Sequence, residues 1–66
     1  MAVLKVIEVL ANSNNSWEEA TQNAVTHAAK SVKHIRSVYV QEQSAIVDRD
    51  TIAEYRVNVK ITFEVK

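Results

Sequence analysis

The stretch AEYRVNVKITFEV (residues 53–65) alternates strictly between apolar and polar side chains. A period of two is typical of a β-strand with one buried and one hydrated face. We therefore expect the apolar side chains from Tyr55 to Val65 to face a core and the polar ones from Glu54 to Glu64 to face away. At about 3.3 Å per residue the stretch would reach roughly 43 Å, well beyond a usual strand. A strand this long is hard to cover in a small chain, so we expect other copies of the protein to complete the fold.

The chain before this stretch predicts a strand followed by a helix. Residues 3–10 (VLKVIEVL) carry apolar residues on both faces, as in a strand that is covered on both sides. A polar connector over residues 11–15 leads to Ser16, which together with Glu19 has the spacing of a capping box. We expect a helix over residues 16–33, because a weakly apolar stripe recurs at helical spacing through it. His27 and His34 would lie seven residues apart on its hydrated face, too far apart to share one metal ion.

Residues 36–47 predict a second strand that pairs with the last one. Ser37, Tyr39, Gln41 and Gln43 share a parity and should lie on the hydrated face, and a loss of phase predicts a β-bulge near residues 43–45. The short turn at residues 48–51 makes the two strands antiparallel neighbours. The fold class is thus α+β, a single domain over residues 1–66 with the order β-α-β-β and a three-stranded antiparallel sheet wrapped around one helix.

The composition limits the function classes. A chain of 66 residues without cysteine has neither a large core nor disulfides to stabilise it, which favours a homo-oligomer. Eight basic and eight acidic residues cancel, which argues against a nucleic-acid partner. The sequence has no apolar run of membrane-spanning length and no signal-peptide pattern, so we expect no membrane partner and a cytoplasmic location. The chain also lacks glycine and proline, so Asn and Asp are expected to supply positive φ angles.

The order of these segments resembles that in the dodecins. The residues that carry the resemblance are Tyr55-Arg56-Val57, which open the alternating tail, and Lys5-Val6-Ile7-Glu8 at the start. The resemblance implies small subunits that assemble as a hollow shell of twelve, and flavins (FMN or riboflavin) that are stored rather than used in catalysis. Flavin-binding members stack the ring on a tryptophan and hold its edge with a glutamine. Those two positions correspond to Ser37 and Arg56 here. Loss of the aromatic platform removes stacking worth about 1–3 kcal/mol, so flavin is the less favoured ligand.

A flavin-free branch, calcium dodecin, is similar in the helix opening Ser16-Trp17-Glu18 and in the pair Glu42-Gln43, which implies a bound cation instead. Because calcium takes several oxygen ligands, Glu42, Asp48 and Asp50 are the candidate ligands. Each has an alternative role. The two aspartates are common turn residues, and Glu42 is a bulge residue that is either solvated or paired with a basic group. Arg56 would bind a carboxylate or phosphate, or pair with Glu54 or Glu64 of another subunit.

No catalytic arrangement is recognisable in the sequence, so we expect a protein that is not an enzyme. The first hypothesis is a dodecin-like homododecamer that binds or sequesters a small molecule or a cation such as calcium. The alternatives are a structural shell without a physiological ligand and a flavin-storage dodecin that uses Tyr39 in place of the missing tryptophan.

Overall fold

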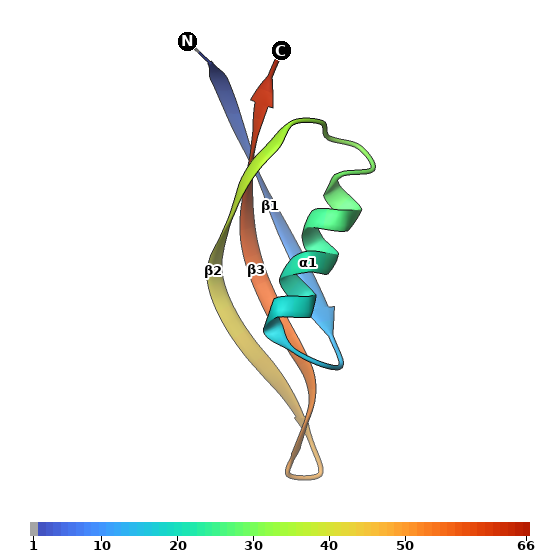
Figure 1. The fold of residues 1–66 in the computed structure, drawn as a ribbon. Coiled ribbons are helices and arrows are strands. Elements are labelled where there is room, and N and C mark those ends of the chain that lie inside the picture. Colours follow the sequence, from blue (N-terminus) through green and yellow to red (C-terminus); the bar gives the residue numbers. More distant parts are fainter. Residues whose placement is uncertain (1) are drawn as a thin grey trace.

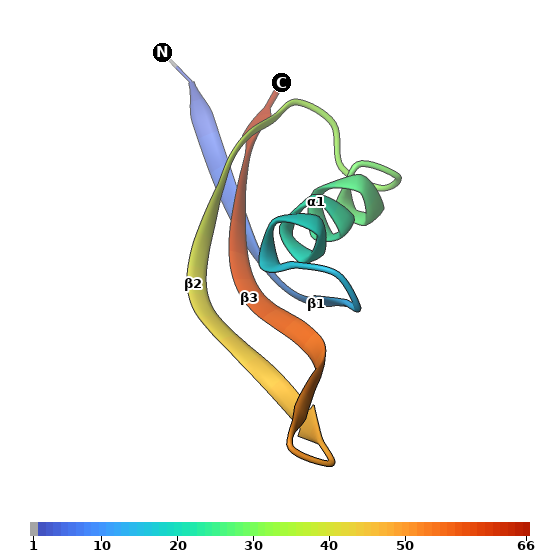
Figure 2. The same ribbon diagram turned by 60° about the horizontal axis from the view of Figure 1, so that its bottom comes forward.

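The longest strand lies at the centre of the sheet. The computed structural model describes residues 2–66 and contains β1 (Val3–Ser13), α1 (Trp17–Ala28), β2 (Ile35–Asp48) and β3 (Thr51–Val65). β3 pairs antiparallel with both other strands, giving the order β1-β3-β2. The sheet curves around α1 on one side (Figures 1 and 2), which confirms the predicted α+β fold.

The alternation in β3 divides the sheet into two faces, as predicted. Val57, Val59 and Ile61 are almost completely buried and form the core with Ala20, Ala24 and Ala28 of the helix. The alanines recur every fourth residue, so they lie on one side of α1 and allow its backbone to approach the sheet closely. We call the opposite side of the sheet, which faces away from α1, the outer face.

Strand β1 is longer and less covered than predicted. It continues to Ser13, because Ala11, Asn12 and Ser13 pair with Val57, Arg56 and Tyr55 of β3. It is also an edge strand, and in one chain the side chains of Leu4, Val6 and Leu10 on its outer face are each more than half exposed. The expectation that β1 is covered on both sides is therefore not met within one chain.

The start of the helix differs from the predicted capping box in one half. The Ser16 Oγ accepts a hydrogen bond from the Glu19 backbone N–H at 3.0 Å, as predicted. The Glu19 carboxylate does not return to Ser16 but accepts hydrogen bonds from the side chains of Ser13 and Asn15. Ser13 is buried and also accepts from the backbone N–H groups of Asn15 and Ser16. The connector is thereby fixed to the first turn of α1.

From the hydrogen bonds to the Glu19 carboxylate we predict a contribution to the free energy of unfolding that is lost in acid. The hydrogen bonds from Ser13 and then Asn15 lower the pKa of Glu19 below its ordinary value of 4.5. A lowered pKa in the folded state means that this contribution is complete above pH 4.5 and is lost as the pH falls through the folded-state pKa. We expect Glu19→Gln to reduce the acid dependence of the unfolding midpoint in urea between pH 6 and pH 3. Glu8→Gln is the control, and equal acid dependence in both variants would contradict the prediction.

The helix ends five residues earlier than predicted. After Ala28 the backbone forms tighter bonds, from Lys30 N–H to His27 and from Ser31 N–H to Ala28, and the chain then returns to the sheet. His34 lies in this connection with φ 63°, so it does not share a helical face with His27. The return is set by Ile35, which pairs with Phe63 at the start of β2.

The bulge predicted near residues 43–45 is not found there, because the register of β2 with β3 shifts instead at three other places, between Ile35 and Ser37, Val40 and Glu42, and Ile46 and Val47. The register with β3 shifts between Val40 and Glu42, so Gln41 has no partner. Up to Tyr39 the predicted faces are correct, but the shift moves Gln43 to the side of the helix, opposite Val57, and Glu42 to the outer face, opposite Asn58. The placement of Gln43 on the hydrated face was therefore wrong.

The predicted turn at residues 48–51 is confirmed, and Asp50 has a positive φ angle there, as expected for an aspartate, but Arg49 and His34 have positive φ angles as well. Arg49 and Asp50 have φ values of 53° and 66°. Two consecutive positive φ angles match the right-handed twist of a hairpin, and the asparagines before the helix do not adopt them. An arginine thus occupies a conformation that usually favours glycine or asparagine.

The single chain is more extended than a compact domain of its length. Its radius of gyration is 13.4 Å, against about 10.8 Å for a typical compact domain of 66 residues. Its accessible surface is 4957 Å², whereas a compact monomer of 7.4 kDa exposes roughly 4200 Å². The β2–β3 hairpin extends past the start of α1 (Figure 1), which agrees with the expectation that so long a strand is hard to cover within one small chain.

Candidate functional site

The outer face carries a hollow over the middle of the sheet. It has a volume of about 440 Å³ and is open to solvent. All three strands contribute to it, and its lining residues are Leu10, Ala11, Asn12, Glu42, Gln43, Ser44, Arg56, Val57 and Asn58. Two residues singled out from the sequence for different reasons, Glu42 and Arg56, therefore line the same hollow.

The bulge at Gln41 decides which polar side chains reach this hollow. Because the register shifts there, Glu42 lies opposite Asn58 and Ser44 lies opposite Arg56 on the outer face. On the other side of β3, Leu10 is the partner of Asn58 and Asn12 is the partner of Arg56. The result is two adjacent rows across the sheet. One row contains the Glu42 carboxylate and the Asn58 carboxamide, and the other contains the Ser44 hydroxyl, the Arg56 guanidinium and the Asn12 carboxamide.

Asn58 is the functional candidate that the sequence did not reveal. Its side-chain Oδ1 is buried and has no hydrogen-bond partner within residues 2–66. A buried polar atom without a partner costs about 1–3 kcal/mol, so such an atom in a native fold calls for a partner outside the chain. The only sequence signal is a short polar side chain between Val57 and Val59, which alternation alone explains equally well.

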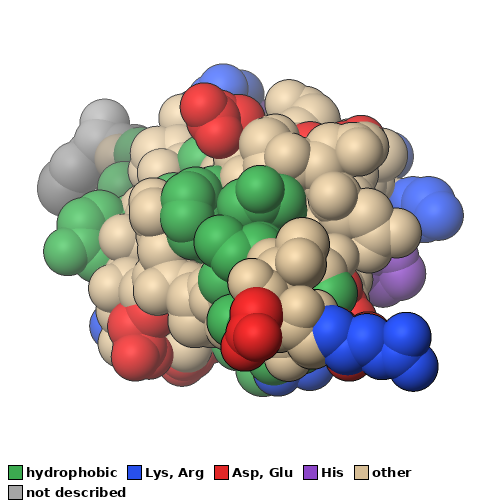
Figure 3. Space-filling model, turned by 90° about the horizontal axis from the view of Figure 1, so that it is seen from below, with side chains coloured by type: hydrophobic (Ala, Val, Ile, Leu, Met, Phe, Trp, Pro, Cys, Tyr) green, Lys and Arg blue, Asp and Glu red, His purple; other side chains and the backbone are tan. Residues whose placement is uncertain are grey.

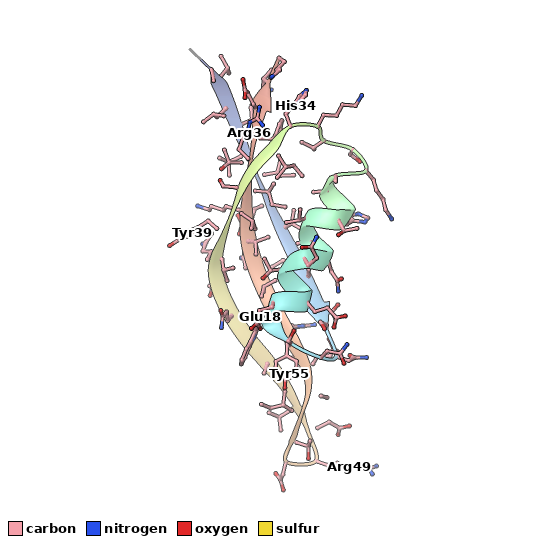
Figure 4. The ribbon with its side chains drawn as sticks, in the orientation of Figure 1. Glu18, His34, Arg36, Tyr39, Arg49 and Tyr55 are labelled. Atoms are coloured by element: carbon pink, nitrogen blue, oxygen red, sulfur yellow. The ribbon has the colours of Figure 1, made fainter. Side chains whose placement is uncertain are left out.

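Ser37 and Arg56 lie on the same face but far apart. Ser37 is opposite Thr62, six residues along β3 from Arg56, which is roughly 20 Å at about 3.3 Å per residue. One ligand could contact both positions only if each came from a different subunit. Near Ser37, Tyr39 is 66% exposed and projects from β2 away from the helix (Figure 4), with Lys60 as its cross-strand partner.

The three candidate cation ligands do not meet in one chain. Asp48 and Asp50 lie at the end of the hairpin, next to the labelled Arg49 in Figure 4, and Asp48 is six residues from Glu42 along β2. That separation is again about 20 Å. Within the described residues 2–66 no three acidic or histidine side chains are grouped closely enough to hold a metal ion. A common site would need residues from several chains.

Two acidic residues that were considered as partners of Arg56 have partners within the chain. Glu64 forms an ion pair with Arg36 at 2.6 Å, and the Glu54 carboxylate accepts a hydrogen bond from Asn12 at 2.5 Å. Trp17 at the start of the helix, in contrast, packs against the hairpin. Its ring meets Tyr55 edge-on at 4.9 Å, and its Nε1–H donates to the Ser44 carbonyl oxygen.

Comparison with known proteins shows one family throughout. The Dodecin family model matches residues 3–66. The calcium dodecin of Mycobacterium tuberculosis is 38% identical over 66 residues, which covers all of this chain and 93% of that protein. Its crystal structure, described as a calcium-chelating antigen with a novel calcium-binding site, has a TM-score of 0.83 and covers 97% of this chain and 91% of its own. A variant of the Thermus thermophilus dodecin has a TM-score of 0.94 at 26% identity, covering 100% and 98%. No helix within residues 2–66 is long and apolar enough to cross a membrane.

Proposed function

Since the chain belongs to the dodecin family, we propose that it is the subunit of a hollow homododecamer that binds and sequesters a cation such as calcium. The proposal gives the outer face two roles, contact between subunits and binding of the ion. It assigns no catalytic role to any residue, and a cytoplasmic location stays a prediction from the sequence.

The assembly is supported by the surface that one chain leaves uncovered. The accessible surface exceeds that of a compact monomer by about 750 Å², so one chain leaves more surface uncovered than a monomer of its mass usually does. Apolar side chains on the outer face of β1 are part of this surface. Burial against sister chains would supply the apolar contacts that a core of six small and medium-sized residues provides only sparingly.

The choice of a cation rests on one observation, the unpartnered Asn58 oxygen next to Glu42 in the hollow. A carboxylate and a carboxamide oxygen are ligands that calcium prefers, and calcium takes 6–8 oxygens at about 2.3–2.6 Å. One chain offers too few, so the remaining ligands would be waters or oxygens of other subunits, with Asp48 and Asp50 as candidates. The 38% identity to a calcium dodecin favours the same class of ligand. The backbone is more similar to the Thermus dodecin, but ligand choice depends on side chains, so we give the sequence more weight.

The native mass tests the assembly. Static light scattering of the purified protein should give about 89 kDa, twelve times the 7.4 kDa of one chain. A mass of one or two subunits in physiological salt would contradict the homododecamer.

Calorimetry tests the ion site. Titration of the metal-free protein with calcium chloride should give a saturable heat, because a specific site binds a fixed number of ions. Glu42→Gln, which removes the charge at constant shape, should abolish it, and Asp48→Asn should weaken it. Glu8→Gln is the matched control, since Glu8 lies on the same outer face opposite Lys60 but outside the hollow. Unchanged binding in both test variants would contradict the assignment, and no saturable heat in the wild type would favour a structural shell without a ligand.

A flavin-storage dodecin remains the second candidate because Tyr39 is an exposed aromatic platform next to Lys60 on the outer face. Such a protein would quench the fluorescence of added riboflavin, and Tyr39→Ala would remove the quenching. If the wild-type protein does not quench riboflavin fluorescence, this candidate is excluded.

A further inference from the structure

The hollow on the outer face has walls that belong to the two edge strands of the sheet. Leu10–Asn12 of β1 line one side and Glu42–Ser44 of β2 line the other, with β3 as the floor between them. We call these segments the β1 wall and the β2 wall. An edge strand has a row of backbone groups without a ladder partner, so its position depends on contacts outside the sheet. On the opposite side of the sheet, α1 packs against all three strands and is placed to supply such contacts.

Trp17 connects the start of α1 to the β2 wall. Its indole Nε1–H donates a hydrogen bond of 2.9 Å to the carbonyl oxygen of Ser44, which lines the hollow. Ser44 lies opposite Arg56, just beyond the register shift that brings Glu42 to the outer face. The ring of Trp17 also meets Tyr55, the residue before Arg56 in β3, edge-on at 4.9 Å. The indole thus contacts both strands next to the row that holds the guanidinium.

Packing fixes the direction of this hydrogen bond. Seen from the hairpin end, hydrophobic side chains gather at the centre of the molecule with acidic and basic ones around them (Figure 3). Tyr55 lies toward this end, below the start of α1 (Figure 4). Trp17 is half-buried, so its ring has little freedom to turn the N–H away from the β2 wall.

Asn23 makes the equivalent connection to the β1 wall. Its side-chain Nδ2–H donates to the carbonyl oxygen of Asn12 at 3.2 Å, and Asn12 lines the hollow as well. Two residues earlier in the same wall, Leu10 is the cross-strand neighbour of Asn58, whose oxygen is buried. Within residues 2–66, the bonds from Trp17 and Asn23 are the two in which a side chain of α1 donates to a strand. Both end on the backbone of a wall.

We propose that Trp17 and Asn23 are positioning residues for the outer-face site, which hold the β2 and β1 walls in the arrangement that binds the cation. The inference rests on the proposed cation site. Neither side chain is among the described residues that line the hollow, so each acts through a wall. The β2 wall carries Glu42, and the β1 wall flanks the Asn58 oxygen. Because calcium takes its oxygens at about 2.3–2.6 Å, a wall that drifts lowers the fraction of molecules that can bind the ion, and the affinity falls by the same factor.

Asn23→Ala tests the connection to the β1 wall. Because Asn23 is exposed, the substitution mainly removes the hydrogen bond, and calcium binding in calorimetry should weaken about three- to tenfold. Gln22→Ala is the matched control, because Gln22 is the neighbouring exposed carboxamide and its Nε2–H donates to Thr26 within the helix. Both variants lose one carboxamide and one hydrogen bond, so we expect similar thermal unfolding midpoints without calcium and weaker calcium binding in Asn23→Ala alone.

An isosteric analogue tests the connection to the β2 wall. Trp17 is the only tryptophan of the chain, so growth of a tryptophan auxotroph on benzothienylalanine replaces this residue alone. The analogue keeps the two fused rings but has sulfur in place of the N–H. It therefore retains the packing against Tyr55 and loses the donor to Ser44. We expect an unchanged native mass and calcium binding that is about three- to tenfold weaker.

The outcomes separate this inference from the proposed function. Wild-type calcium affinity in both Asn23→Ala and the analogue-containing protein would overturn the inference and leave the ion site standing. Equal weakening in Gln22→Ala would also overturn it, because the effect would then come from the helix as a whole. If the wild-type protein gives no saturable heat with calcium chloride, the inference and the proposed cation site both fail.

Discussion

Val6→Lys is expected to lower the native mass of the protein from the proposed twelve subunits to one or a few, or to unfold it. Val6 lies on the outer face of the edge strand β1 and is 56% exposed in the single chain, where a lysine would be tolerated at little cost. If sister chains cover this face, the substitution buries an unpaired ammonium group, which costs several kcal/mol in each subunit. In the proposed shell this cost would recur in each of the twelve subunits. Light scattering together with circular dichroism distinguishes dissociation from unfolding.

Two controls separate the position from the added charge. Thr26→Lys adds the same charge at an exposed position of α1, outside the hollow on the outer face, and should leave the mass unchanged. Val6→Thr keeps the side-chain shape without a charge and should have an intermediate effect. An unchanged mass and an unchanged melting temperature in Val6→Lys would mean that the outer face of β1 meets water rather than another subunit.

Ile61→Ala should produce the largest loss of stability within a subunit. Ile61 has no exposed surface and is the largest of the fully buried side chains, in β3 between Ile7 and Val38 of the two neighbouring strands. Replacement of a buried isoleucine by alanine costs about 2–5 kcal/mol, because apolar contacts are lost and a cavity remains. A domain of this size has only a few kcal/mol of net stability from its own core, so most of the variant should be unfolded outside the assembly.

The loss is measured by denaturant unfolding at a fixed protein concentration, since association raises the apparent stability of an oligomer. Ile61→Val serves as the graded control, with an expected cost of about 0.5–1.5 kcal/mol. If the two variants unfold at the same denaturant concentration, the side chain of Ile61 does not pack against the helix as described.

The fold was largely predictable because its decisive signal is local. The alternation over residues 53–65 identified the central strand and both of its faces, and Ser16 identified the start of the helix. The end of the helix was wrong, because the residues after Ala28 continue an apolar spacing that the need to return to the sheet at Ile35 overrides. The ends of strands and helices depend on where the chain must next pair, which is not a local property.

The candidate site was predictable only in part, because it depends on a shift of one residue in the pairing of β2 with β3. Glu42 and Gln43 are adjacent polar residues with weak preferences, and only the pairing of Val40 with Val59 and of Glu42 with Asn58 decides which one reaches the outer face. Asn58 could not be identified from the sequence, because its importance comes from the missing partner of its oxygen. Alternation indicates that a side chain faces away from the core, but it does not reveal what that side chain meets there.

The pairing of Val3 with Val65 has a consequence for biosynthesis. The strand that pairs with both others is the last of the three to leave the ribosome, so β1 and β2 have no strand partner until β3 has emerged. Until then the apolar side chains of β1 can pack only against the short helix, and they are accessible to chaperones and to non-native contacts. In the proposed assembly, subunits can recognise each other only after β3 has joined the sheet, so the yield of complete particles should depend on how quickly β3 pairs with β1 and β2.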